Sequence, residues 1–447
     1  MSGAHAWLEN YSRPELHRPL GNSMPMHVPF APSAKGFSSM QKVAPPAPAA
    51  YRPLWIIILS AGLIVGIAMG LRQVAGLYLP PMTRELGIGR EPFSNAMAIA
   101  NLMWGAGAVF AGMIADRYGA GRVVVTGALA TMIGTYLMYA AQSGFDLLVS
   151  GVFLGIGVSG TGITSLVGAV GRASPPEQRT AAIAALGMAG GIGGFVAFPY
   201  THVLMDLLGW KASLLVLVAT CAVMLPLALP LSGKPQAEAG VVKAQSLGEA
   251  FREAFTHPSY LLLVTGFFVC GFHVAFYSVH LPAFVADKGL DNSVAVIALT
   301  MVGLANLAGT YIAGQSARFV EKRKGLSFIY FGRCFVFLGL LFLPITPATV
   351  ILLSTLLGFL WLSTVPLTSS LVATFFGTTW MSMLFGVVFL SHQVGSFVGL
   401  RLAGYLYDMT KSYDAMWWIS IALGLFAALV HSPIRERPVA RLEPKPA

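Results

Sequence analysis

The sequence predicts an all-α integral membrane protein with twelve transmembrane helices in two six-helix bundles. Of its 447 residues, 56% are hydrophobic and only 10% are charged, against about 25% charged residues in an ordinary soluble domain. The mean hydropathy is +0.72. From Trp55 onward, apolar runs follow one another, each near the ~20 residues that a bilayer-spanning helix requires. Lipid is therefore the expected surroundings of most of the chain.

The apolar runs form two sets of six. The predicted spans of the first set are 55–79, 92–115, 122–141, 147–170, 180–204 and 212–232. Those of the second set are 260–285, 294–317, 325–344, 348–372, 382–406 and 415–431. The predicted parts of the chain are a disordered Pro-rich tail (1–50), an N-terminal six-helix bundle (51–232), a linker (233–258), a C-terminal six-helix bundle (259–432) and a second tail (433–447).

The distribution of Lys and Arg predicts the orientation. If both termini are cytoplasmic, the tails and cytoplasmic loops hold twenty of the 28 Lys and Arg residues, and the outer loops hold five. This follows the positive-inside rule. It also accounts for the net charge of +10 without a nucleic-acid partner.

The two halves repeat one another. Nine residues separate Arg72 from Pro81 in the first half, and nine separate His273 from Pro282 in the second. A parallel repeat of two six-helix halves is a transporter architecture in which substrate binds near the midplane, between the halves. The repeat therefore predicts Arg72 and His273 at equivalent places beside a substrate.

The loop GMIADRYGAGRVV (112–124) resembles the signature between helices 2 and 3 of the major facilitator superfamily. Its candidate gating residues are Gly112, Asp116, Arg117, Gly119 and Arg122. The resemblance covers residues 52–435 and implies the major facilitator fold, with this loop as a latch in the outward-facing state.

Within that superfamily, the chain resembles bacterial members of the monocarboxylate and oxalate–formate transporter group. The stretches that carry this resemblance are GLYLPPMTRELGIGREPFSNA (76–96), GVSGTGI (157–163) and TVPLTSSLVATFFG (364–377). The group often places an arginine in helix 8, where this chain has Asn306. Gly151 stands where proton-coupled antiporters of the superfamily often carry an arginine, which weakens a drug-exporter interpretation.

Ionisable groups inside spans are costly and mark candidate functional sites. The Asp and Glu residues all lie in tails, loops or span ends, whereas Arg72, Arg333 and Arg401 lie within spans. The spans also contain three histidines, His273, His280 and His392. Because the predicted interior holds cations and imidazoles without a carboxylate, we expect the substrate to bring the negative charge.

The candidate substrate-binding residues are Arg72, Gln73, His273, Tyr277, Asn306, His392, Gln393 and Arg401. A guanidinium binds a carboxylate bidentately, which Lys does not; the alternative for Arg72 is a side chain that extends to the outer headgroups. His273 and His392 are candidate proton-linked partners, because histidine changes charge near neutral pH. Arg401 is expected to bind substrate, pair with Asp408 or extend to the headgroups. Arg333 is expected to pair with backbone carbonyls.

These features predict an inner-membrane secondary transporter, not an enzyme, that moves a small organic anion, a monocarboxylate, by alternating access. H⁺ symport is favoured, and anion exchange and facilitated diffusion remain open. The rivals are an exporter of drugs or hydrophobic metabolites and a membrane sensor without flux. The sequence shows no phosphate loop or metal cluster, so we expect no cofactor or metal. The protein is expected to be a monomer, with the anion, H⁺ and membrane lipid as its partners.

Overall fold

We describe residues 53–232, 246–377 and 380–442 of a computed structural model of the protein. Residues Arg52–Ala447 form one compact unit. The predicted tail (1–50) lies outside the described residues, as does the first half of the predicted linker (233–245). Every regular element in the described ranges is a helix, which confirms the all-α class.

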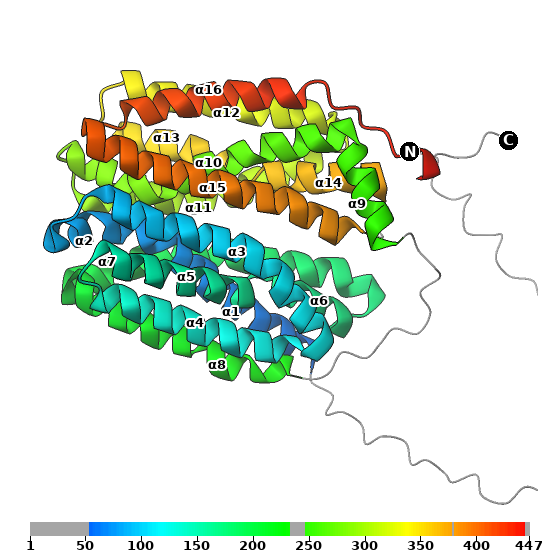
Figure 1. Ribbon diagram of the computed structural model, residues 1–447, viewed down its shortest axis with the longest axis horizontal. Coiled ribbons are helices and arrows are strands. Elements are labelled where there is room, and N and C mark those ends of the chain that lie inside the picture. The colour runs from blue at the N-terminus through cyan, green and yellow to red at the C-terminus, as the bar shows by residue number, and fades with distance from the viewer. Residues whose placement is uncertain (1–52, 233–245, 378–379, 443–447) are drawn as a thin grey trace, which may run out of the picture. The chain divides into compact units, whose positions relative to one another are not determined.

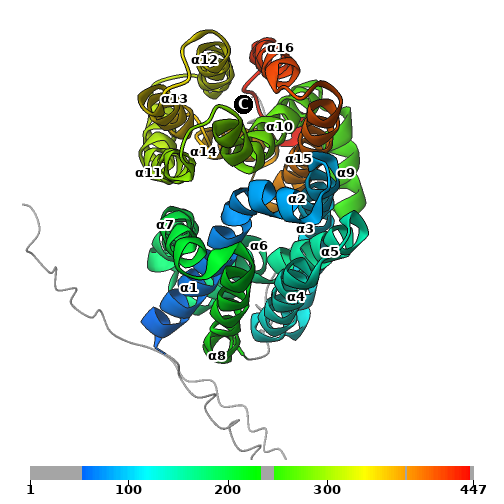
Figure 2. The ribbon, with the colours of Figure 1, turned by 90° about the vertical axis from the view of Figure 1, so that its left-hand side faces the viewer.

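Two sets of helices follow one another along the chain. The N-terminal bundle contains α1 (Leu54–Gln73), η1 (Val74–Tyr78), α2 (Leu79–Leu86), α3 (Arg90–Tyr118), α4 (Ala120–Ala140), α5 (Gly144–Thr161), α6 (Ile163–Ala173), α7 (Pro176–Ala222), α8 (Met224–Leu227) and η2 (Leu229–Leu231). The C-terminal bundle contains α9 (Leu247–Thr256), α10 (Pro258–Asp287), α11 (Asn292–Ser316), α12 (Lys322–Phe342), α13 (Pro347–Phe359), α14 (Thr364–Phe376), α15 (Met381–Thr410) and α16 (Asp414–His431), followed by η3 (Ala440–Leu442). Figure 1 and Figure 2 show these two sets as two groups of helices.

Eleven segments of the described chain are long and apolar enough to span a membrane. One of them, Ala182–Leu231, has 50 residues, which would extend about 75 Å as a single helix, more than twice the ~30 Å hydrocarbon core. Gly209, with φ 77° and ψ 161°, interrupts it. The segment therefore holds the fifth and sixth predicted spans, in agreement with twelve spans in total.

The predicted linker ends in a helix of its own, α9. Ser246 and Glu249 form a capping box at its start, in which each side chain accepts a hydrogen bond from the backbone N–H of the other residue. The N–H and hydroxyl of Ser246 hold the pKa of the Glu249 carboxyl below its ordinary value. Ala250 and Ala254 are buried, so one face of α9 packs onto the protein.

Helices α3 and α15, one from each bundle, lie side by side and antiparallel (Figure 1). A Cβ atom on Gly404 would lie 2.7 Å from the Ser94 side chain, and one on Gly105 would lie 2.8 Å from the Gln393 side chain. These two contacts are eleven residues apart on both helices, which is close to three helical turns. They therefore mark one continuous face of contact.

The same register, extended by two turns on each helix, would bring Gly112 of α3 opposite Gly386 of α15. A Cβ atom at either glycine would meet no described atom within 4 Å. The helices therefore touch near the start of α3 and have separated by the level of Gly112. We call the end of the bundles where α3 begins the closed end, and the opposite end the open end.

Candidate functional site

A cavity lies between the N-terminal bundle and α10. Its volume is about 70 Å³, which is room for a few water molecules or a small carboxylate, because one water needs about 10–15 Å³ of such space. Arg72 of α1, Asn101 and Trp104 of α3 and Ser278 of α10 are among its polar lining residues. Arg72 is the only charged residue among the described residues that line it.

Two residues of α3 hold the guanidinium of Arg72. Its Nη2 donates a hydrogen bond of 2.9 Å to Asn101 Oδ1, and its Cζ lies 4.7 Å from the centroid of the Trp104 ring. Asn101 Nδ2 donates to the carbonyl oxygen of Met97 at 2.8 Å, which leaves Oδ1 for Arg72. A guanidinium carries five N–H donors. Within the described chain Arg72 makes this one side-chain hydrogen bond and no ion pair, so donors remain for a ligand.

Trp104 supplies a second donor beside Arg72. Its side chain lines the cavity, and its Nε1 is buried without an acceptor among the described residues. A buried indole N–H normally finds an acceptor. The ring packs edge-on against Phe389 of α15, with 5.1 Å between ring centroids, so the C-terminal bundle helps to position it.

His392 and Gln393 of α15 are linked to Arg72 by hydrogen bonds. Gln393 Nε2 donates to the carbonyl oxygen of Asn101 at 3.1 Å, so Gln393 Oε1 is free to accept, and it does so from His392 Nδ1 at 3.0 Å. Asn101 therefore receives Arg72 on its side chain and Gln393 on its backbone. The path Arg72–Asn101–Gln393–His392 crosses from one bundle to the other.

Gln73 and His273 do not line the cavity. Gln73 packs against α7, where a Cβ atom on Gly194 would collide with its amide. His273 is buried, and its Nε2 donates to the carbonyl oxygen of Ser420 in α16 at 2.9 Å. Its ring also lies 4.9 Å from that of Phe337 in α12, so it faces the interior of the C-terminal bundle.

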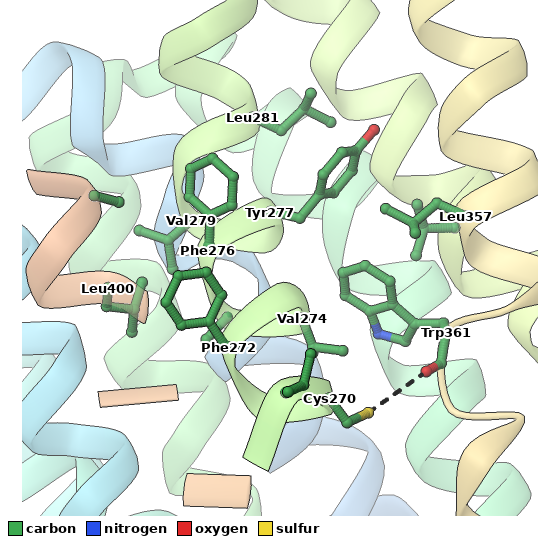
Figure 3. Close-up of a cluster of buried hydrophobic side chains, with 14 of the residues drawn as sticks. Cys270, Phe272, Val274, Phe276, Tyr277, Val279, Leu281, Leu357, Trp361 and Leu400 are labelled. Carbon is green, nitrogen blue, oxygen red and sulfur yellow. Dashed lines mark hydrogen bonds between the residues drawn. The ribbon is translucent and has the colours of Figure 1, made fainter. Parts of the chain in front are cut away.

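Tyr277 also lies away from the cavity. Its hydroxyl pairs with Ser354 Oγ of α13 at 2.7 Å, and Ser354 donates to its own helix, so the tyrosine is the donor. Figure 3 shows Tyr277 on the side of α10 that faces Leu357 and Trp361, while Phe276 projects from another side of the helix. The hydroxyl is therefore used within the bundle and does not reach a substrate in the cavity.

The repeat fails to superimpose Arg72 and His273 because the two halves have different helix geometry after these residues. In the first half the chain tightens into the five-residue 3₁₀ segment η1, whereas α10 continues as an α-helix to Asp287. A 3₁₀-helix turns 120° per residue and an α-helix 100°. Five residues thus add about 100° of rotation, which turns equivalent positions to different faces.

Asn306 and Arg333 stabilise the break between α13 and α14. Asn306 Oδ1 accepts hydrogen bonds from the backbone N–H of Leu362 at 3.0 Å and from its own helix. Arg333 is fully buried and donates to the carbonyl oxygens of Leu360 and Trp361, as expected for a pairing with backbone carbonyls. Both residues satisfy backbone groups that the break leaves without helical partners, and neither lines the cavity.

Arg401 and the gating signature lie elsewhere. Arg401 is exposed on α15. At the open end, a Cβ atom on Gly112 would meet no described atom within 4 Å, and the Cζ atom of Arg117 lies 5.4 Å from the ring centroid of its neighbour Tyr118. The signature residues span the turn from α3 to α4: Gly112, Asp116, Arg117, Gly119 and Arg122. Gly119 has a φ of 96° at that turn, and the side chain of Asp116 lies outside what the structure describes.

The closed end carries contacts between the bundles that sequence reasoning did not predict. Arg90 forms a bidentate pair with Asp287 at 2.5 and 2.8 Å, and its Cζ lies 3.7 Å from the Tyr407 ring centroid. Asp408 accepts hydrogen bonds from the backbone N–H groups of Arg90 and Glu91, each at 2.8 Å. No pattern in the sequence pairs Arg90, Asp287 and Asp408 with one another.

Asn101 and Trp104 were also missed, although one signal could have found the first. Asn101 is a neutral polar residue inside an apolar run, which is the criterion that selected Asn306. Trp104 gives no comparable signal, because tryptophan is common in apolar spans and its unpaired N–H is evident only from the packing.

The membrane spans and the contacts between the two bundles are those of a multi-pass membrane protein. The chain belongs to the Major Facilitator Superfamily, whose family model matches residues 54–400, and is a transporter rather than an enzyme. It is 29% identical over 277 residues to monocarboxylate transporter 11 of Mus musculus, a match that covers 58% of this chain and 59% of the mouse protein. It is 25% identical over 253 residues to the putative niacin/nicotinamide transporter NiaP of Bacillus subtilis (strain 168), covering 55% and 62%.

The fold is similar to that of a solved bacterial homologue of the human lysosomal transporter Spinster, in an inward-facing and unoccupied conformation. The TM-score is 0.65 at 16% identity, and the match covers 86% of this chain and 94% of that chain. This likeness concerns the fold alone. The matches to the mouse and Bacillus subtilis relatives span about three fifths of their lengths.

Proposed function

We propose that the protein transports a small monocarboxylate across the membrane by alternating access. The observation that carries this proposal is the guanidinium of Arg72, which lines a cavity and has no carboxylate partner among the described residues. A charge within a membrane span is costly unless it is paired. A substrate carboxylate supplies that pairing, and the apolar lining accommodates the rest of the molecule.

In the proposed binding mode, the carboxylate accepts N–H bonds from Arg72 and from the indole of Trp104. Asn101 positions the guanidinium through its Oδ1 atom. Such charge-assisted bonds are about twice as strong as neutral ones. The names of the mouse and Bacillus subtilis relatives, a monocarboxylate transporter and a putative niacin/nicotinamide transporter, support a substrate of this class.

We propose that the chain lies with both termini in the cytoplasm of a bacterial inner membrane, as its Lys and Arg distribution predicts. The closed end is then the outer end, and the conformation faces inward. Substrate would enter the cavity after the bundles rock apart at the closed end and together at Gly112 and Gly386.

H⁺ symport is the proposed coupling, with His392 as the residue that binds the carried proton. Protonated His392 and an empty Arg72 would place two positive charges on one hydrogen-bonded path, which is unfavourable. A bound carboxylate neutralises Arg72 and removes that repulsion. Anion binding would thus favour protonation, and the loaded carrier would move an anion and a proton together.

Uptake by proteoliposomes tests the proposal. Lactate, pyruvate, acetate and nicotinate are supplied under an inward-directed proton gradient. Arg72→Ala should abolish uptake, and Arg72→Lys should retain charge but raise KM. Trp104→Phe should raise KM by about 10-fold to 150-fold, for loss of one hydrogen bond to a charged group. Arg401→Ala is the matched control, because that arginine is exposed and should not affect uptake.

A second candidate, export of hydrophobic compounds, is favoured by one observation: most of the cavity lining is apolar. The same vesicles distinguish the two functions. Uptake of no carboxylate, together with Arg72-independent transport of an apolar compound, would replace the monocarboxylate proposal.

A further inference from the structure

At the closed end, four residues from both bundles form a closed ring of hydrogen bonds. We call Arg90, Ser94, His280 and Tyr413 the gate ring. Arg90 Nη1 lies 2.8 Å from Tyr413 Oη, and Tyr413 Oη lies 2.8 Å from His280 Nδ1. His280 Nε2 lies 3.1 Å from Ser94 Oγ, which lies 2.7 Å from the carbonyl oxygen of Arg90.

The direction of every bond in the gate ring follows from its members. A guanidinium only donates, so Tyr413 Oη accepts from Arg90 and its own proton is directed to His280 Nδ1. Burial raises the pKa of the Tyr413 hydroxyl above its ordinary value, so that proton is present. His280 Nδ1 is therefore an acceptor, and Nε2 carries the imidazole proton. Nε2–H donates to Ser94 Oγ, whose hydroxyl donates to the carbonyl oxygen of Arg90.

The closed ring thus requires neutral His280 in a single tautomer. A proton added at Nδ1 would face the O–H of Tyr413, so two donors would oppose each other. Tyr413 could turn its proton away only by giving up its present acceptor. His280 and Tyr413 are 1% and 3% exposed, so water does not offer a ready replacement.

The charges around His280 also disfavour a second cation. On α3, the nearest charge is the guanidinium of Arg90. The carboxylate of Asp408 in α15 already accepts hydrogen bonds from the backbone N–H groups of Arg90 and Glu91. On α10 itself, Asp287 is paired with Arg90. Tyr407 and Tyr413 are the other titratable groups, and both stack with Arg90. Every described carboxylate at this end that contacts the gate ring is thus already engaged.

We propose that His280 is a proton-binding site of the gate, at which a proton from the solution at the closed end favours opening of that end. The proton is not the one carried across the membrane. His280 is enclosed on the closed side of the cavity, so a proton bound there in the open state must leave to the same side before the gate closes. The proposal rests on the alternating-access part of the proposed function and needs no particular substrate.

Distances between spin labels at Arg84→Cys of α2 and Lys288→Cys after α10 test this proposal in lipid nanodiscs without substrate. Both positions are exposed and lie on different bundles at the closed end. As the pH falls through the histidine range near 6.5, the ratio of open to closed molecules should rise by up to about tenfold per pH unit, the limit for one linked proton.

His280→Asn, which stays neutral, should remove the pH dependence between 5 and 8. His202→Asn is the matched control, because His202 pairs with Asp206 on α7 and lies outside the gate ring. Nitrogen-15 NMR of histidine in the unaltered chain should find Nε2–H and an unprotonated Nδ1 for His280 at pH 8. This measurement, with His280→Gln, decides the matter if His280→Asn does not fold.

An unchanged pH dependence in His280→Asn, or an Nδ1–H tautomer in the closed state, would overturn the proposal. Because no substrate is present in these measurements, failure of the monocarboxylate proposal would not alter them. A substrate that proves to be something else leaves the gate ring and its test in place.

Discussion

Gly89→Ala should open the closed end without changing any charge. Gly89 has φ −67° and ψ 179°, which alanine adopts without strain. A Cβ atom there would lie 2.7 Å from Asp408 Cγ, so the carboxylate would have to move. That carboxylate accepts the first two N–H groups of α3, and Gly89 has no side chain with which to replace it.

Asp408 is an N-cap supplied by the other bundle, so its loss acts on the gate more than on the helix. Removing an N-cap costs about 0.5–2 kcal/mol. Here the cap stabilises only the closed state, in which α15 touches the start of α3. A loss of about 1–2 kcal/mol would raise the ratio of open to closed molecules by about 5-fold to 30-fold.

The label pair Arg84→Cys and Lys288→Cys measures this ratio directly, since the three native cysteines are buried. Gly248→Ala is the control: it is the same change in a helix, at a glycine whose Cβ would meet no described atom, and it should leave the distances unaltered. If Gly89→Ala also leaves them unaltered while the protein stays folded, the cap from Asp408 does not hold the gate closed.

Three further changes probe other contacts. Gly112→Ala should lower turnover without lowering the unfolding temperature, because the added methyl group obstructs only the state in which α3 meets α15 at Gly386. Turnover equal to that of the unaltered protein would contradict the register of that face. Asn306→Leu should lower the free energy of unfolding by about 1–2 kcal/mol, because the Leu362 N–H loses its acceptor, and denaturation in detergent measures this loss. Gly271→Ala should destabilise the protein by about 1–3 kcal/mol and lower transport, because the added Cβ would collide with the carbonyl oxygen of His392. A stable, active variant would show that α10 and α15 are free to separate there.

The topology was predictable from the sequence because lipid imposes a simple rule on it. Each span must be apolar over about 20 residues, so length and hydropathy alone locate the helices to within a few residues. The 26-residue polar break (233–258) also follows from hydropathy, and it divides the predicted spans into two sets of six. The helix α9 within this break was missed, although Ser246 and Glu249 have the spacing of a capping box.

The site was only partly predictable. Arg72 was found because a permanent charge in a span is conspicuous. The repeat predicted His273, and with it Tyr277 on the same helix, beside the substrate. The 3₁₀ segment η1 in the first half rotates its helix relative to the α-helical second half, so equivalent positions lie on different faces. Helix type over five residues does not show in hydropathy. The gate was missed for a different reason, because Arg90 and Asp408 are 318 residues apart and no local pattern joins them.

The three arginines inside the spans show how the surroundings of a charge indicate its role. Arg333 is fully buried, and the carbonyl oxygens at a helix break accept hydrogen bonds from its Nε and Nη2 atoms, while its Nη1 atom has no partner among the described residues. Arg401 is exposed. Of the three, only Arg72 lines the cavity, where its guanidinium has a single neutral acceptor and a neighbouring indole N–H without an acceptor. In our proposal, the cavity is what distinguishes Arg72 from the other two arginines, because it gives an anion room to bind its guanidinium and to leave again. This is why the same residue type is structural at 333 and, in our proposal, binds substrate at 72.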